Sequence, residues 1–116
     1  MGEKYAPHIK LSVRRDGTSF FGPGIAELLE LVDQEGSLKV ACARMGLSYS
    51  KGRYILRRAE QCLEFPLIEI RHGGQGGGAS VLTEEGRRCL TGYREIEREV
   101  TAYAAGLFES RWRTNE

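Results

Sequence analysis

Two short helical segments joined by a tight turn restrict the possible folds of this chain more than any other feature of its sequence. The first segment begins at Ser37, a residue that caps helix N-termini well, and stops at Gly46. Ser48 can cap a second helix, which we expect to run from residue 49 to about residue 63. A turn of about three residues that contains glycine and joins two such helices predicts a helix-turn-helix motif over residues 37–63.

The residues before this motif predict a β-hairpin and one helix. Apolar and polar residues alternate over 9–13, as in a half-buried strand. Asp16-Gly17 then favours a tight turn before a return strand, so we expect an N-terminal hairpin. Apolar residues at helical spacing follow within residues 23–36, and they predict a helix with one buried face.

The residues after the motif predict a second hairpin and a long helix. Residues 67–71 and 80–82 have strand character, and a glycine run at 73–78 separates them. This arrangement predicts a two-stranded wing over about 67–82. A long helix over about 84–108 follows, because acidic residues occupy its first turn and apolar residues recur along it at helical spacing.

The length and composition are those of one ordinary domain, which we expect to occupy residues 1–116. The elements above predict a mainly α fold with small β: a winged helix-turn-helix with an N-terminal hairpin, a two-stranded wing and a long C-terminal dimerisation helix. No apolar run approaches the roughly 20 residues that span a bilayer. We therefore expect a cytoplasmic protein that does not associate with a membrane.

The sequence contains no motif for catalysis, metal binding or cofactor binding. Its three cysteines form no Cys-x-x-Cys pair, and neither His8 nor His72 has a partner at metal-ligand spacing. The glycine run lacks the Gly-Lys-Ser/Thr ending and the following helix of a phosphate-binding loop. We therefore expect no enzymatic activity, no metal site and no cofactor.

The charge is distributed unevenly, although the net charge is only +1. Residues 37–75 contain seven basic and three acidic residues, whereas residues 21–36 contain four acidic residues and no basic one. At 100° per residue, Tyr49 falls with the apolar residues on the expected core face of the helix over 49–63. The opposite face carries short polar side chains, one tyrosine and several cations.

A helix of this composition suits the major groove of duplex DNA, where its first residues reach base edges and its later cations contact phosphates. Arg71 and His72 flank the glycine run, whose backbone can also approach DNA closely. The alternative is that these side chains form an ordinary solvated surface. The candidate DNA-binding residues are Ser37, Ser48, Ser50, Lys51, Arg53, Tyr54, Arg57, Arg58, Arg71, His72 and Gln75.

The C-terminal helix carries an apolar stripe with heptad spacing, in which successive members are separated by 4, 3, 4, 3 and 4 residues. Such a stripe predicts that two copies of the chain pair through this helix. The alternative is that the stripe folds back onto its own domain. The candidate dimer-interface residues are Cys89, Tyr93, Ile96, Val100, Tyr103 and Leu107.

Several short motifs, in their order and spacing, resemble the N-terminal DNA-binding domain of the ModE-type molybdate-responsive transcription regulators. The motifs are Gly36-Ser37, Gly46-Leu47-Ser48-Tyr49, Pro66-Leu67-Ile68, the glycine run, and Leu82-Thr83 followed by Gly86. The resemblance extends from about Ile9 to Leu107. It implies a winged helix-turn-helix that dimerises through a long helix. The sequence departs from the family at Gly52-Arg53, where we expect Ala-Trp, so recognition specificity does not transfer.

These observations predict a transcriptional regulator that binds double-stranded DNA sequence-specifically as a homodimer, at a roughly palindromic operator. A link to molybdenum metabolism is implied by the resemblance alone. The sequence ends about nine residues beyond Leu107, so we expect no molybdate-binding module. Two alternatives remain, a non-specific architectural DNA-binding protein and a protein-interaction module on a winged-helix scaffold.

Overall fold

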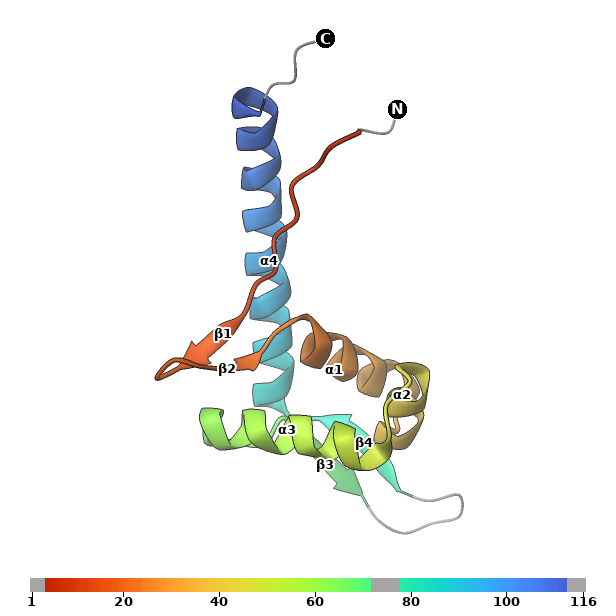
Figure 1. Cartoon of the computed structure of the whole chain (residues 1–116). Coiled ribbons are helices and arrows are strands. Elements are labelled where there is room, and N and C mark those ends of the chain that lie inside the picture. The colour runs from red at the N-terminus through yellow and green to blue at the C-terminus, as the bar shows by residue number, and fades with distance from the viewer. Residues whose placement is uncertain (1–3, 72–77, 113–116) are drawn as a thin grey trace.

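The computed structural model describes residues 4–71 and 78–112 of the chain. The described part is mainly helical, with two small antiparallel hairpins, which confirms the predicted mainly α fold with small β elements. Its elements are, in chain order, β1 (Val13–Arg15), β2 (Thr18–Phe21), α1 (Pro23–Glu35), α2 (Leu38–Arg44), α3 (Tyr49–Leu63), β3 (Ile68–Arg71), β4 (Ala79–Leu82) and α4 (Glu84–Arg111) (Figure 1).

The N-terminal hairpin forms, but its first strand begins later than its sequence pattern predicted. Asp16 and Gly17 adopt φ angles of 50° and 82°, and this left-handed turn joins β1 to β2. The strand expected from residue 9 begins at Val13, which pairs with Phe21, the last residue of β2. The chain then turns into α1, so the strand pairing with β2 does not extend to residues 9–12.

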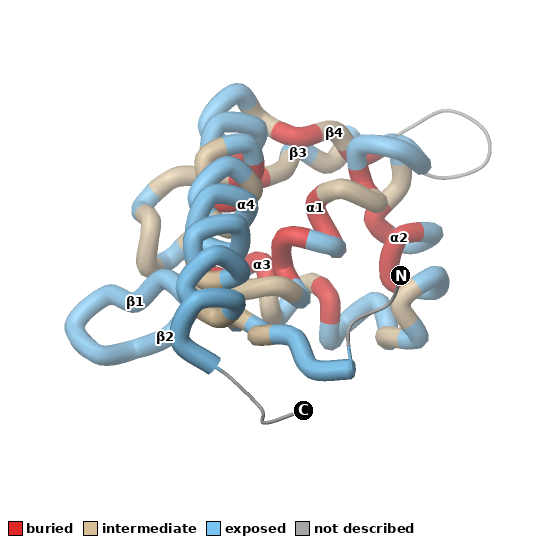
Figure 2. Tube along the Cα trace, turned by 90° about the horizontal axis from the view of Figure 1, so that it is seen from above, coloured by how far each residue is buried: buried red, intermediate tan, exposed pale blue. Residues whose placement is uncertain are grey.

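Helix α1 is the centre of the hydrophobic core and contacts each of the other three helices. Leu28, Leu29 and Val32 on its inner face are fully buried, and they pack with Leu56 of α3 and Leu67. In Figure 2 the buried positions gather along α1, α2 and the adjoining parts of α3 and α4. One apolar core therefore fixes the four helices around α1.

Helices α2 and α3 are joined by residues 45–48, and side chains cap both helices. Ser37 Oγ accepts a hydrogen bond from Val40 N, and Ser48 Oγ accepts one from Lys51 N, both at 3.1 Å. Gly52 is buried where the two helices meet, and a Cβ at this position would overlap Cys42 Sγ. The glycine thus allows a close approach of α3 to α2, which sequence reasoning about helix propensity does not detect.

The second hairpin is tied to the start of α2 through Ser80, a buried polar residue of β4. Its Oγ accepts a hydrogen bond from Leu38 N at 3.1 Å, and its backbone N–H donates to Gly36 O at 2.9 Å. These bonds satisfy polar groups that burial would otherwise leave unpaired. The position of the β3–β4 hairpin relative to α2 is thereby fixed.

Helix α4 is attached to the domain along its first half. Tyr93 packs against Phe21 with the ring centroids 5.2 Å apart, and its hydroxyl donates to Leu11 O at 2.8 Å. Arg94 donates two hydrogen bonds of 2.8 Å to Glu30 of α1, and these bonds lower the pKa of the Glu30 carboxyl. Beyond this point, α4 projects away from the other helices and from the two hairpins (Figure 1).

None of the helices within the described residues is both long and apolar enough to span a membrane.

Candidate nucleic-acid interface

The outward face of α3 carries the polar and basic side chains that the helical periodicity of the sequence predicted for it. They are all exposed, and they are Ser50, Lys51, Tyr54, Arg57, Arg58 and Gln61. The assignment of Tyr49 to the core face was wrong, because Tyr49 is 42% exposed. Side chains of a helix lean toward its N-terminus, so a residue in the first turn extends past the region that the core covers.

Four cations on α3 have no acidic partner in the part of the chain that the structure describes. Within residues 4–71 and 78–112, neither Lys51, Arg53, Arg57 nor Arg58 forms an ion pair. By contrast, Arg44 at the end of α2 is paired with Glu35. The face of α3 is therefore a concentrated positive surface on a chain whose net charge is only +1.

Two of these cations lie beside tyrosines of the same helix. Lys51 Nζ is 5.7 Å from the centre of the Tyr54 ring. Arg53 lies with Cζ 5.8 Å from the centre of the Tyr49 ring, and its Nη1 donates a hydrogen bond of 3.1 Å to the Tyr49 hydroxyl. Cation–π contacts and this hydrogen bond restrict the conformations of both cationic side chains.

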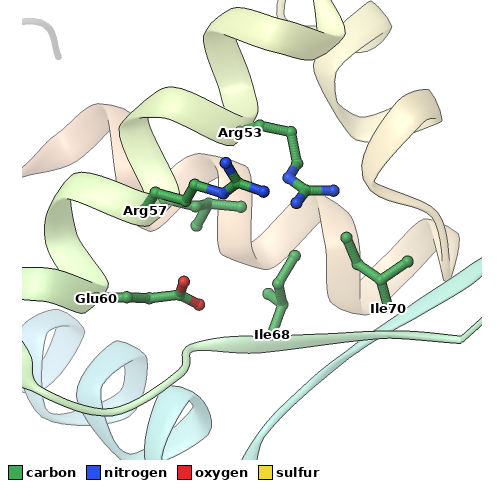
Figure 3. Close-up of a pocket in the computed structure, with 6 residues that line it drawn as sticks. Arg53, Arg57, Glu60, Ile68 and Ile70 are labelled. Carbon is green, nitrogen blue, oxygen red and sulfur yellow. The ribbon is translucent and has the colours of Figure 1, made fainter.

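Two hollows adjoin the row formed by Arg53 and Arg57. One is a shallow groove on the outward face of α3, which Tyr49, Tyr54 and Arg58 also line. The other is a cleft of about 200 Å³ between α3 and β3, whose remaining lining residues are Leu56, Glu60, Ile68 and Ile70 (Figure 3). The same two guanidinium groups thus face both the open surface and the cleft.

Two candidate serines also serve as helix caps. Ser37 and Ser48 use their hydroxyl oxygens as acceptors for backbone N–H groups of α2 and α3. Ser48 Oγ lies 3.4 Å from Ser50 Oγ, so the two hydroxyls stand together at the exposed start of α3. Each hydroxyl keeps a hydrogen that can be donated to a further acceptor.

The candidate residues of the β3–β4 hairpin are only partly described. Arg71 is exposed at the end of β3, where its Nη2 lies 3.5 Å from Glu69 Oε1. His72 and Gln75 lie outside the described residues. Surface ion pairs of this kind contribute little stability, so the Arg71 guanidinium can exchange its partner for another anion.

The candidate dimer-interface residues divide into two groups. Tyr93 is only 4% exposed and Cys89 packs against the core, so both contact their own domain. Ile96 is 53% exposed and Tyr103 is 71% exposed, and Val100 and Leu107 are exposed as well. An apolar hollow of about 270 Å³, lined by Leu11, Val13, Phe20, Leu63 and Cys89 among others, reaches Ile96 and continues the stripe.

The cysteines have the surroundings of core residues. Burial raises the pKa of the Cys42 and Cys89 thiols, which keeps both protonated at neutral pH. Among the residues that the structure describes, no three His, Cys, Asp or Glu side chains are grouped so as to hold a metal ion.

Sequence reasoning missed the role of Tyr49 beside Arg53 and the cleft between α3 and β3. The spacing of Tyr49 and Arg53, four residues apart in a helix, is a signal that could have identified the pair. The cleft depends on how β3 lies against α3, which local sequence patterns do not report.

Comparison with known proteins identifies relatives of this chain, although no family model matches it. The molybdenum-pterin-binding protein MopA of Rhodobacter capsulatus is 31% identical over 99 residues, which cover 85% of this chain and 37% of MopA. ModE of Azotobacter vinelandii, a molybdenum transport protein, is 34% identical over 77% of this chain and 32% of its own length. The DNA-binding transcriptional dual regulator ModE of Escherichia coli K12 is 31% identical over 73% of this chain and 32% of its own length.

The relatives include DNA-binding transcriptional regulators, and none of the three is named as an enzyme. The chain is a homologue of the ModE and Mop proteins, and the resemblance predicted from its motifs is confirmed. It spans about a third of the length of these curated relatives.

Proposed function

We propose that this chain is a transcriptional regulator that binds duplex DNA sequence-specifically as a homodimer. In this proposal the fold acts as a winged helix-turn-helix: α3 enters the major groove, and the β3–β4 hairpin is the wing beside it. The observation that carries the proposal is the set of four cations on α3 that no acidic side chain within the described residues neutralises. A link to molybdenum-related genes is proposed from the ModE relatives.

The arrangement of α3 supports separate roles for its two ends. Ser50 and Lys51 are exposed in the first turn, where a groove-binding helix brings side chains closest to base edges. Arg57 and Arg58 are exposed further along, where the helix leaves the groove and passes the sugar-phosphate backbone. We therefore assign base recognition to the first pair and phosphate contacts to the second.

The projecting half of α4 supports the homodimer. Ile96, Val100, Tyr103 and Leu107 form an exposed apolar stripe at heptad spacing, and a second copy of the helix would remove it from water. A symmetric pair of helices places two α3 helices in two half-sites related by a two-fold axis. The operator is therefore expected to be roughly palindromic.

Two substitutions in α3 test these roles against one another. Lys51→Ala is expected to lower the affinity for a duplex selected from a random pool by roughly 10-fold, because a base contact is lost. It should lower the affinity for random duplex much less. Arg57→Ala is expected to lower the affinity for both duplexes by the same factor, because a phosphate contact carries no sequence information. Fluorescence anisotropy with the two duplexes measures both effects.

Arg98→Ala is the matched control, because Arg98 is an exposed cation on α4. It should change the affinity for neither duplex by more than about twofold. Equal losses on both duplexes for Lys51→Ala would indicate binding without sequence preference. If Lys51→Ala and Arg57→Ala both bind DNA as the unsubstituted chain does, α3 is not the DNA-binding element.

A further inference from the structure

We infer that Arg53 and Arg57 together hold one backbone phosphate of DNA at the cleft between α3 and β3, with Tyr49 as the positioning residue for Arg53. This inference rests on the proposed DNA-binding function and adds to it a defined anion site. The chemical class of the ligand is a phosphodiester, which two guanidinium groups bind through charge-assisted hydrogen bonds.

The two arginines converge because of their spacing and their surroundings. They stand four residues apart on α3, so they are neighbours on one face of the helix. Figure 3 shows their guanidinium groups next to each other over the cleft, with Ile68 and Ile70 of β3 beneath them. Two like charges that line one cleft repel each other, and an anion bound between them would offset that repulsion.

Glu60, the acidic residue of the cleft, is already engaged. Its Oε2 accepts a hydrogen bond of 2.7 Å from the backbone N–H of Leu67. Among the described residues it forms an ion pair with neither arginine. The Glu60 carboxylate is therefore held at the start of β3, where it contributes one negative charge to a cleft that the two guanidinium groups line with two positive charges.

Arg53 is better fixed than a surface arginine. It is half-buried, its Nη1 donates to the Tyr49 hydroxyl at 3.1 Å, and its guanidinium lies beside the Tyr49 ring. Its remaining N–H groups stay available for a ligand, because a guanidinium has five of them. Fixing the side chain before binding reduces the entropy that is lost when the phosphate is bound.

The cleft lies between the helix proposed to enter the major groove and the hairpin proposed as the wing. In the proposed docking, a backbone phosphate at the edge of the major groove would lie between these two elements. A free tetrahedral oxyanion would use the same donors, and the experiment separates the two sources.

The salt dependence of binding tests whether the two arginines share one phosphate. Each phosphate contact contributes about 0.9 to the slope of log affinity against log salt. The double substitution Arg53→Ala/Arg57→Ala is expected to reduce the slope by about 0.9 per bound subunit, which corresponds to the loss of one phosphate contact. Arginines on two separate phosphates would reduce it by about 1.8 per subunit, and that result overturns the inference.

Neutral backbone positions locate the phosphate. A series of duplexes is made in which a neutral methylphosphonate replaces the phosphate at one pair of symmetric positions at a time. At one position, the replacement is expected to lower the affinity of the unsubstituted chain by roughly 10-fold and to leave the affinity of the double variant unchanged. If every position weakens both proteins equally, the inference fails although the chain binds DNA. If the unsubstituted chain binds no duplex at all, the proposed function fails, and this inference fails with it.

Tyr49→Phe isolates the positioning role, because it removes the hydroxyl and keeps the ring. It is expected to weaken duplex binding about threefold in the unsubstituted chain and not at all in Arg53→Ala. A general structural effect would weaken binding in both backgrounds and would not depend on Arg53 in this way. Equal losses in both backgrounds overturn the role of Tyr49.

A titration with inorganic phosphate tests whether the site instead binds a free anion. Saturable phosphate binding that needs both arginines, combined with the absence of any sensitive methylphosphonate position, would assign the site to a free anion. That result would overturn the DNA assignment.

Discussion

Val100→Glu is expected to convert the protein from a dimer into a monomer and to lower its affinity for a two-half-site duplex by roughly 100-fold or more. The proposed dimer buries the exposed stripe of α4, and a carboxylate placed in that stripe would have to be buried without a partner. A dimer binds its second half-site at a high effective concentration, and a monomer loses this gain. Sedimentation equilibrium and anisotropy with one-site and two-site duplexes measure both consequences.

The stability of the domain itself should change little in this variant. Val100 is exposed in the single chain and lies beyond Tyr93 and Arg94, which attach α4 to the core. Ala105→Glu is the control, because Ala105 is also exposed and lies on the heptad face opposite the stripe. It should remain dimeric and keep its affinity. A monomeric unsubstituted chain at tens of micromolar would refute the proposed dimer and the palindromic operator together.

Gly86→Ala is expected to lower the free energy of unfolding by about 3 kcal/mol, at the upper end of what overpacking costs. A Cβ at Gly86 would overlap the carbonyl oxygen of Leu67, and it would lie 2.9 Å from the carbonyl carbon. Because the obstacle is backbone, no side-chain rotation can relieve it. The start of α4 would have to move away from Leu67, whose carbonyl accepts a hydrogen bond of 2.9 Å from Thr83 N.

The same substitution elsewhere in α4 provides the control. A Cβ at Gly92 would meet no atom within 4 Å. Gly92→Ala should therefore raise the free energy of unfolding by up to about 1 kcal/mol, since alanine has the higher helix propensity. Chemical denaturation compares the two variants. If Gly86→Ala is as stable as Gly92→Ala, the close approach of α4 to Leu67 does not determine the packing at this point.

The parts of the fold that could be predicted from the sequence are those that depend on local rules. Ser37 and Ser48 identify the starts of α2 and α3 because capping involves only residues of the same turn. The exposed face of α3 follows from helical periodicity. Tyr49 was misassigned because a helical wheel treats the first turn like the middle of a helix.

Tertiary contacts account for what the sequence did not predict. Gly52 and Gly86 are needed because Cys42 Sγ and the Leu67 carbonyl lie against them, and neither neighbour is close in sequence. Similarly, the heptad spacing of α4 is the same whether a residue faces its own domain or a second copy. Only the fold distinguishes Tyr93, which is buried in the core, from Ile96, which is exposed.

The cleft beside Arg53 could not be predicted from the sequence either, because it too depends on tertiary contacts. Sequence reasoning identified Arg53 and Arg57 as cations of one helix, but the apolar floor beneath them comes from β3. The shared role that we propose for them therefore depends on the placement of a hairpin that Ser80 fixes through hydrogen bonds to Gly36 and Leu38.

Competition binding tests the central claim most directly. The unsubstituted chain is titrated with a duplex selected by the chain itself from a random pool, and with random duplex, at the same physiological salt concentration. Sequence-specific regulation predicts that the selected duplex binds about 10³-fold more tightly or better. Equal affinity for the two duplexes would contradict specific recognition and indicate an architectural DNA-binding protein, and the absence of binding to either would contradict the DNA-binding function itself.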